Sequence, residues 1–104
     1  MDIRATSKAM DYIMSQKSRY HAPCLLIHTH TYKICIKTAT VYRVDLEEFI
    51  PAFNQQPWIP ILTQPLPIPL YIDSCLNSST IKKIILGLRI EEGRSRLVVA
   101  RISE

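Results

Sequence analysis

The residues best suited to bind a metal or to catalyse a reaction lie in one stretch of this sequence. Their order is Cys24-x3-His28-x-His30-x4-Cys35, which offers two thiols and two imidazoles. Zinc prefers four such ligands in a tetrahedron, but this spacing matches none of the common zinc modules. On a strand, Cys24, His28 and His30 share one face, whereas Cys35 falls between two lysines. We therefore expect no metal site and no cofactor, and these four residues are only weak candidates.

A nucleophilic enzyme needs a Ser or Cys, a base within hydrogen-bond reach, and a group that orients the base. The histidines are available bases and Cys24 is a thiol, but no local signature such as Gly-x-Ser-x-Gly is present. Adjacent Glu47 and Glu48 would point about 100° apart on a helix and would not form an acid–base pair. Two glycines are too few for a glycine-rich phosphate loop. We expect that the protein is not an enzyme.

Lysines and arginines form the strongest functional pattern. Residues 1–44 hold seven of them against two acids, residues 45–81 hold four acids and none of them, and residues 82–104 hold six against three acids. Such basic stripes bind phosphate backbones, with aromatic rings available for base stacking. The alternative is a solvated sheet face whose charges prevent exposed strand edges from pairing with other chains. The candidate nucleic-acid-binding residues are Lys33, Lys37, Arg43, Arg89, Arg94, Arg96 and Arg101.

Residues 51–69 hold six of the seven prolines and the only tryptophan. Tryptophan is enriched at binding hot spots, and prolines reduce the entropy lost on ordering, so this segment is a second candidate surface. The alternative is that Phe53 and Trp58 close one end of the core. The candidate protein-interface residues are Phe53, Trp58, Pro65, Pro67 and Pro69.

Periodicity predicts the elements of the N-terminal half. Residues 2–19 are expected to form an amphipathic helix, capped by Asp2 or Thr6 and ended before Pro23. Residues 24–30 and 32–44 are expected to be strands. In the second strand the even positions are mostly β-branched or aromatic and the odd positions include the lysines, which predicts a buried face and a basic face.

The C-terminal half is punctuated by prolines and one turn. Asp45 is expected to cap a short helix at 46–50. Prolines alternate with aliphatic residues at 65–70, which predicts a polyproline-like segment or an outermost strand. The segment from Ile81 to Leu88 fits either a helix or a strand. We favour a hairpin, with Gly93 in its turn and residues 97–102 as the second strand.

Length and composition predict one globular domain, residues 1–104, with 47% apolar and 21% charged residues. The N-terminus has no apolar signal region, and no apolar stretch reaches the length of a membrane span. Three cysteines do not make an even disulfide framework. We therefore expect a reducing, intracellular, cytoplasmic setting, no membrane partner, and cysteines that fill the core.

Together these patterns predict an α+β fold, in which an N-terminal helix packs on a mainly antiparallel sheet with a Pro-rich edge segment and a C-terminal β-hairpin. The preferred function is a small accessory or regulatory protein that binds DNA or RNA through the basic strand face and the hairpin. The alternative is an interaction or inhibitor protein, monomeric or homodimeric, that docks through residues 51–70. A phage or viral accessory protein is compatible with so compact and motif-poor a chain.

Overall fold

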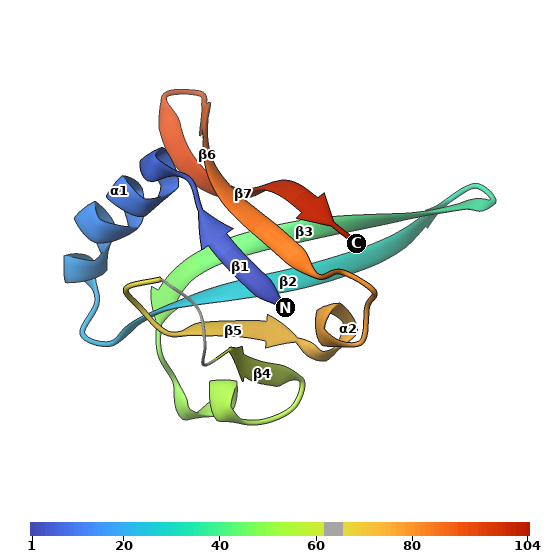
Figure 1. The fold of residues 1–104 in the computed structure, drawn as a ribbon, viewed down its shortest axis with the longest axis horizontal. Helices are drawn as coiled ribbons and strands as arrows, with labels where there is room; N and C mark the ends of the chain where they lie inside the picture. Colours follow the sequence, from blue (N-terminus) through green and yellow to red (C-terminus); the bar gives the residue numbers. More distant parts are fainter. Residues whose placement is uncertain (62–65) are drawn as a thin grey trace.

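Two small sheets, one N-terminal helix and a long projecting hairpin build the computed structural model of this chain, which describes residues 1–61 and 66–104 (Figure 1). The strand orders are β1–β6–β7 and β3–β2–β5–β4. This small α+β architecture confirms the predicted fold class, with two mixed, mostly antiparallel sheets in place of one. The elements are β1 (Asp2–Ala5), α1 (Ser7–Gln16), the 3-10 turn η1 (Lys17–Arg19), β2 (Pro23–Ile34), β3 (Lys37–Glu48), the 3-10 turn η2 (Pro51–Asn54), β4 (Trp58–Ile61), β5 (Leu70–Asp73), α2 (Ser74–Asn77), β6 (Lys83–Glu91) and β7 (Arg94–Ser103).

The N-terminal helix begins later than its hydrophobic pattern predicts. Residues 2–5 form β1, which pairs in parallel with β6 and places Ile3 opposite Ile84 in the core. The helix starts after Thr6, whose side-chain oxygen accepts a hydrogen bond from the amide of Ala9 at 3.2 Å. The predicted start at residue 2 is therefore wrong, because apolar residues at 3 and 5 fit a strand as well as a helical stripe.

Strand β2 is buried on both faces over residues 24–27 and so separates two apolar clusters. The larger cluster fills the space between the two sheets and α1. The smaller one is largely aromatic and lies on the other face of β2, around Phe53 and Tyr71. Burial on both sides explains why these four consecutive residues are all apolar.

Residues 32–44 do not form the single strand expected from their alternation. Cys35 and Ile36 form a two-residue turn that joins β2 to β3, and Cys35 takes a positive φ of 58°. Ile27 is the last residue of β2 that pairs with β5. Beyond it β2 is still joined to the body by Thr29, whose amide and hydroxyl donate hydrogen bonds to Asp73, and the ribbon then projects from the body as Figure 1 shows. We call residues 30–41 the arm.

The middle of the chain also differs from the prediction in one place. No helix follows Asp45, since β3 continues to Glu48, and Pro51 begins η2 instead. The carboxylate of Glu48 accepts hydrogen bonds from the amides of His21 and Ala22, which hold the connection into β2 and lower the pKa of Glu48. Local propensity at 46–50 is therefore overridden by twelve residues of cross-strand pairing.

Proline does mark a sheet edge. Strand β4, with Pro60 inside it, is the outermost strand of its sheet, where a missing amide donor is tolerated. The outermost strand predicted at 65–70 is not found there: residues 66–69 belong to no strand, and Leu70 begins β5, which lies between β2 and β4. In this segment Leu66 and Ile68 are buried whereas Pro67 and Pro69 are exposed. Pro65 lies outside the described residues.

The C-terminal hairpin confirms the strand interpretation of the ambiguous segment. Strands β6 and β7 pair in antiparallel fashion, and both turn residues, Glu92 and Gly93, have positive φ. A bulge lies near Ala100, and a Cβ placed on Gly87 would meet the Cβ of Ala100 at 2.8 Å, so only glycine fits there. Within the described ranges, no helix has the length and apolar content needed to cross a membrane.

Candidate nucleic-acid interface

The four arginines predicted in the hairpin share its outer face. Arg89 lies directly opposite Arg96, and Arg94 lies opposite Glu91 at the turn. Strand alternation turns these side chains away from Leu86, Leu88 and Leu97, which face the core. The fourth arginine, at position 101, is exposed at the other end of β7, beyond the bulge.

The three basic residues predicted on one strand face are divided by the turn of the arm. Lys33 lies opposite Thr38, whereas Lys37 lies opposite Ile34 and Arg43 opposite His28. Because directly opposed residues share a face, Lys37 and Arg43 lie on one face of the ribbon and Lys33 on the other. The prediction of a single basic strand face is therefore wrong, since it counted alternation through a turn.

Two hollows that share Arg96 lie along the outer edges of β3 and β7. One, of about 220 Å³, is bordered by Arg19, Tyr12, Tyr20 and Leu97 among others. The second, of about 300 Å³, lies between β3 and β7 and is bordered by Tyr42, Arg89, Arg96 and Val98 among others. We call the two hollows together the basic groove.

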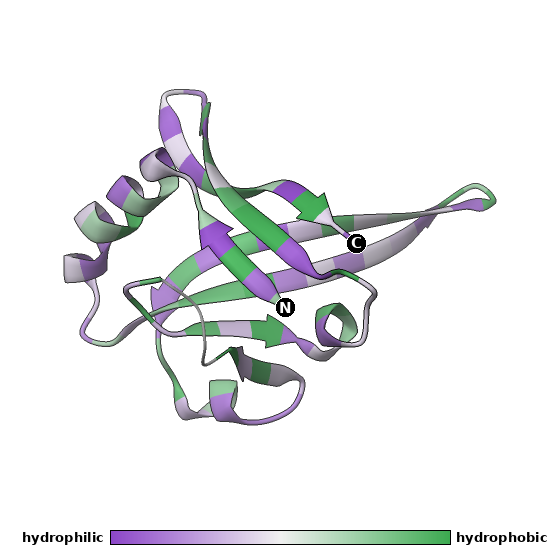
Figure 2. Cartoon of the chain, in the orientation of Figure 1, coloured by the Kyte–Doolittle hydropathy of each residue, from purple (hydrophilic) through white to green (hydrophobic). Residues whose placement is uncertain are grey.

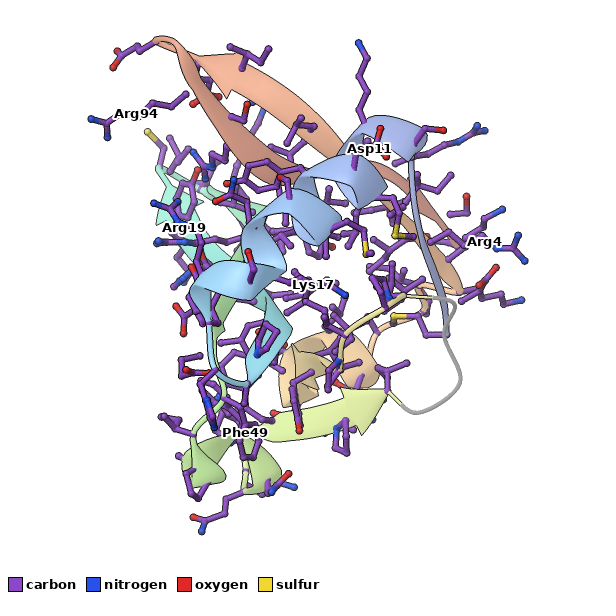
Figure 3. All side chains as sticks on the ribbon, turned by 90° about the vertical axis from the view of Figure 1, so that its left-hand side faces the viewer. Arg4, Asp11, Lys17, Arg19, Phe49 and Arg94 are labelled. Carbon is purple, nitrogen blue, oxygen red and sulfur yellow. The ribbon has the colours of Figure 1, made fainter. Side chains whose placement is uncertain are left out.

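Arg94 lies at the hairpin turn, where it borders a further hollow with Arg96, Glu91 and Glu92. Figure 3 shows Arg19 and Arg94 on the same side of the molecule, with Arg4 on the opposite side. Arg19 and Arg96, which border the same hollow, are 77 residues apart in the sequence.

Sequence reasoning missed part of this groove. The helix residues Tyr12 and Gln16, which border the smaller hollow, were not predicted to belong to it. The available signal was their helical spacing with Arg19, since residues three and seven apart lie on one helix face. The side chain of Arg19 donates a hydrogen bond to Gln16 at 2.8 Å, so this face is linked across the end of the helix.

Glu91 partly neutralises the groove. Its carboxylate lies 3.2 Å from Arg89 and 3.7 Å from Arg96, and all three side chains are about half exposed. Ion pairs of this kind contribute little to stability in water, so a phosphate can replace the carboxylate at small cost. Among the residues described, Arg94 and Arg101 form no ion pair and are available to a ligand.

The cysteine and histidine cluster does not assemble. Cys24 is buried, and its burial raises the pKa of the thiol to about 11, with Glu47 and Glu48 adding to the rise. Cys35 occupies the turn at the other end of β2, on the order of 30 Å away at about 3.3 Å per residue. In the described part of the chain, no three histidine, cysteine or acidic residues could jointly hold a metal ion. The prediction that all cysteines fill the core is right for Cys24 but wrong for the exposed Cys35 and Cys75.

His28 is held in a small polar and aromatic group. Its Nε2 lies 3.1 Å from a carboxylate oxygen of Asp45, which also pairs with Arg43 at 3.1 Å. Trp58 packs edge-on against the imidazole with 4.9 Å between ring centroids. Although this carboxylate lies beside the ring, the buried Nε2 of His28 forms no hydrogen bond with any described residue. The nearest cysteine in β2, Cys24, is a buried and unreactive thiol.

The residues predicted to dock a protein divide into buried and exposed ones. Phe53 is only 7% exposed and Trp58 is half-buried, so both close the smaller apolar cluster. Pro67 and Pro69 do reach the surface. They border a hollow of about 520 Å³, which lies on the side of the molecule that faces the viewer in Figure 3. Its other borders are Lys17, Ala22, Pro23, Phe49, Ile68 and Tyr71.

Comparison with known proteins identifies no relative: no protein-family model, no curated protein and no solved structure matches this chain.

Proposed function

We propose that this protein is a non-enzymatic nucleic-acid-binding protein whose contact surface is the basic groove. The proposal rests on one observation. Arg19 borders one hollow of the groove, Arg89 borders the other, and Arg96 borders both, although Arg19 and the other two come from opposite ends of the chain. Three tyrosines also border these hollows. Arginine donates paired hydrogen bonds to phosphate oxygens, and tyrosine rings stack on bases. The groove therefore offers both kinds of contact that a nucleic acid needs.

The overall charge of +4 is modest, and part of the negative charge has a structural role. Asp73 accepts a hydrogen bond from the amide of Leu76, which caps α2, and further ones from Thr29. Glu48 holds the amides of residues 21 and 22. These two acids do not border the groove, whereas Asp45, which pairs with Arg43, borders its smaller hollow.

The test is the salt dependence of binding, measured by fluorescence anisotropy with labelled duplex DNA, single-stranded DNA and RNA. Replacing Arg96 by Gln should weaken binding to all sequences and reduce the slope of log Kd against log salt by about one for the lost phosphate contact. Arg19→Gln should do the same. Arg4→Gln is the matched control, since it removes the same charge on the opposite side of the molecule.

Two results would contradict the proposal. The first is no salt-dependent binding of the wild-type protein to any of the three nucleic acids. The second is an equal loss of affinity in the Arg4 and Arg96 variants, because that would show a response to net charge alone and not to the groove.

A protein partner is the second candidate, and the hollow beside Pro67 and Pro69 favours it. Exposed prolines with Phe49 and Tyr71 form an apolar surface that a peptide segment or a second copy of the chain can cover. The homodimer form of this proposal predicts a mass that rises with concentration in sedimentation experiments, and Pro69→Glu should abolish the rise. A monomer at all concentrations would exclude the homodimer.

A further inference from the structure

The turn of the arm exposes a large aliphatic side chain to solvent. Ile36 is 98% exposed and Ile34 beside it is 56% exposed. The ribbon from Thr31, which still borders a hollow with Leu76, to Ile34 spans about 10 Å at about 3.3 Å per residue. Figure 2 shows hydrophobic colour at the far end of the arm, well away from the body. No core contact explains an isoleucine at this position.

The surroundings of Ile36 are cationic. Lys33 and Lys37 lie close to the turn on opposite faces of the ribbon, and the sequence has no Asp or Glu between Asp11 and Asp45. Two such arms would repel each other, so arm-to-arm pairing of two copies is disfavoured. A surface of phosphates is the complementary partner.

The base of the arm is continuous with the basic groove. Thr40 and Val41, at the body end of the arm, and the adjacent Tyr42 border the same hollow as Arg89 and Arg96. A polyanion that reaches the groove therefore also reaches the arm. A lipid surface would contact the exposed turn alone.

We propose that Ile36 is an apolar wedge, which enters a base-pair step of duplex DNA from the minor groove and bends the duplex. Lys33 and Lys37 hold phosphates on either side of the wedge, and the basic groove binds the duplex that the bend brings toward the body. An exposed aliphatic side chain at the end of a narrow basic ribbon suits this role, because wedge insertion unstacks the bases while lysines contact the backbone. The inference rests on the proposed nucleic-acid function and names its substrate as duplex DNA.

The experiment measures bending and binding on the same duplex. Dyes at the two ends of a duplex of about 30 base pairs report bending by energy transfer, and anisotropy reports binding. Wild-type protein should raise the transfer efficiency, as expected for a bend of roughly 20–90°. Ile36→Ser should lose this rise, with the affinity kept within about tenfold because phosphate contacts carry most of it. Ile90→Ser is the matched control, since Ile90 is 72% exposed in the other hairpin and should leave bending unchanged.

Several outcomes would overturn the inference. If the wild-type protein binds the duplex without bending it, the wedge role of Ile36 is refuted, but the proposed nucleic-acid-binding function is not. Equal bending by wild type and the Ile36 variant has the same consequence. Binding to vesicles of phosphatidylserine and phosphatidylcholine that depends on Ile36, with no bending of DNA, would assign the turn to membranes. Absence of binding to every nucleic acid would instead refute the proposed function itself.

Discussion

Replacing Glu91 by Gln should strengthen nucleic-acid binding, because this carboxylate occupies the place of a phosphate between two arginines. Its oxygens lie 3.2 Å from Arg89 and 3.7 Å from Arg96. In water, removal of a negative charge about 7 Å from a bound phosphate strengthens binding about threefold. If the freed arginines gain one phosphate contact, the increase in Kd between 50 mM and 200 mM salt should be about 3.5 times larger for the Glu91 variant than for the wild type.

The measurement is an anisotropy titration at several salt concentrations, with Glu92→Gln as the control. Glu92 is in the same turn and its loss changes the net charge equally, but among the described side chains it forms no ion pair with an arginine. Glu92→Gln should therefore change affinity less and leave the salt slope unchanged. Equal effects of the two substitutions, or weaker binding by the Glu91 variant, would refute the reasoning. Stability should change little in both, since exposed ion pairs contribute about 0–1 kcal/mol.

Two further predictions concern the body of the fold. Gly87→Ala should lower the free energy of unfolding, measured in urea, by about 1–3 kcal/mol, because the new Cβ would meet that of Ala100 at 2.8 Å. Adding Ala100→Gly should restore most of the lost stability. If the single variant loses no stability, the close packing of residues 87 and 100 is contradicted. The pKa of Cys24, raised to about 11 from the ordinary value of 9, means that the folded state holds the thiol proton more tightly than the unfolded state. The free energy of unfolding should therefore decline as pH rises from 9 to about 11, and Cys24→Ala should remove the part of the decline that is due to this thiol. Identical pH profiles of stability for the wild type and the Cys24 variant would contradict this prediction.

The sequence alone predicted the elements whose periodicity is unbroken. Alternation of aliphatic residues over 84–90 and the turn at Gly93 identified the β6–β7 hairpin. The bulge that places Arg101 on the same face as Arg96 was not predicted. Proline indicated a sheet edge in this region but at the wrong residues, since the edge strand is β4 with Pro60 and not the segment at 65–70. These inferences depend on local geometry, which the chain determines over a few residues.

The errors arose where a pattern fits two geometries. The alternation over 32–44 continues through the turn of the arm, because a two-residue turn without glycine or proline leaves the count of odd and even positions undisturbed. Cys35 takes a positive φ there, a position that glycine or asparagine usually occupies, so no residue type marked the turn. Because the turn was not predicted, Lys33 and Lys37 were wrongly assigned to the same strand face. The contribution of Tyr12 to the groove required the packing of α1 beside β3 and β7, which no local pattern contains.

The uneven distribution of charge along the chain has a spatial counterpart. The first and last segments are basic, and the fold joins them, since β1 pairs with β6 and the outer edges of β3 and β7 lie side by side. The acidic middle segment is used for hydrogen bonds and ion pairs within the body, through Asp45, Glu48 and Asp73. What projects from the body is the arm, which is basic and carries an exposed isoleucine at its turn. The groove is basic, and the ribbon that starts beside it ends in an exposed apolar residue. Duplex DNA fits this combination better than a protein surface does, because it offers both phosphates and base-pair steps between which an apolar side chain can insert.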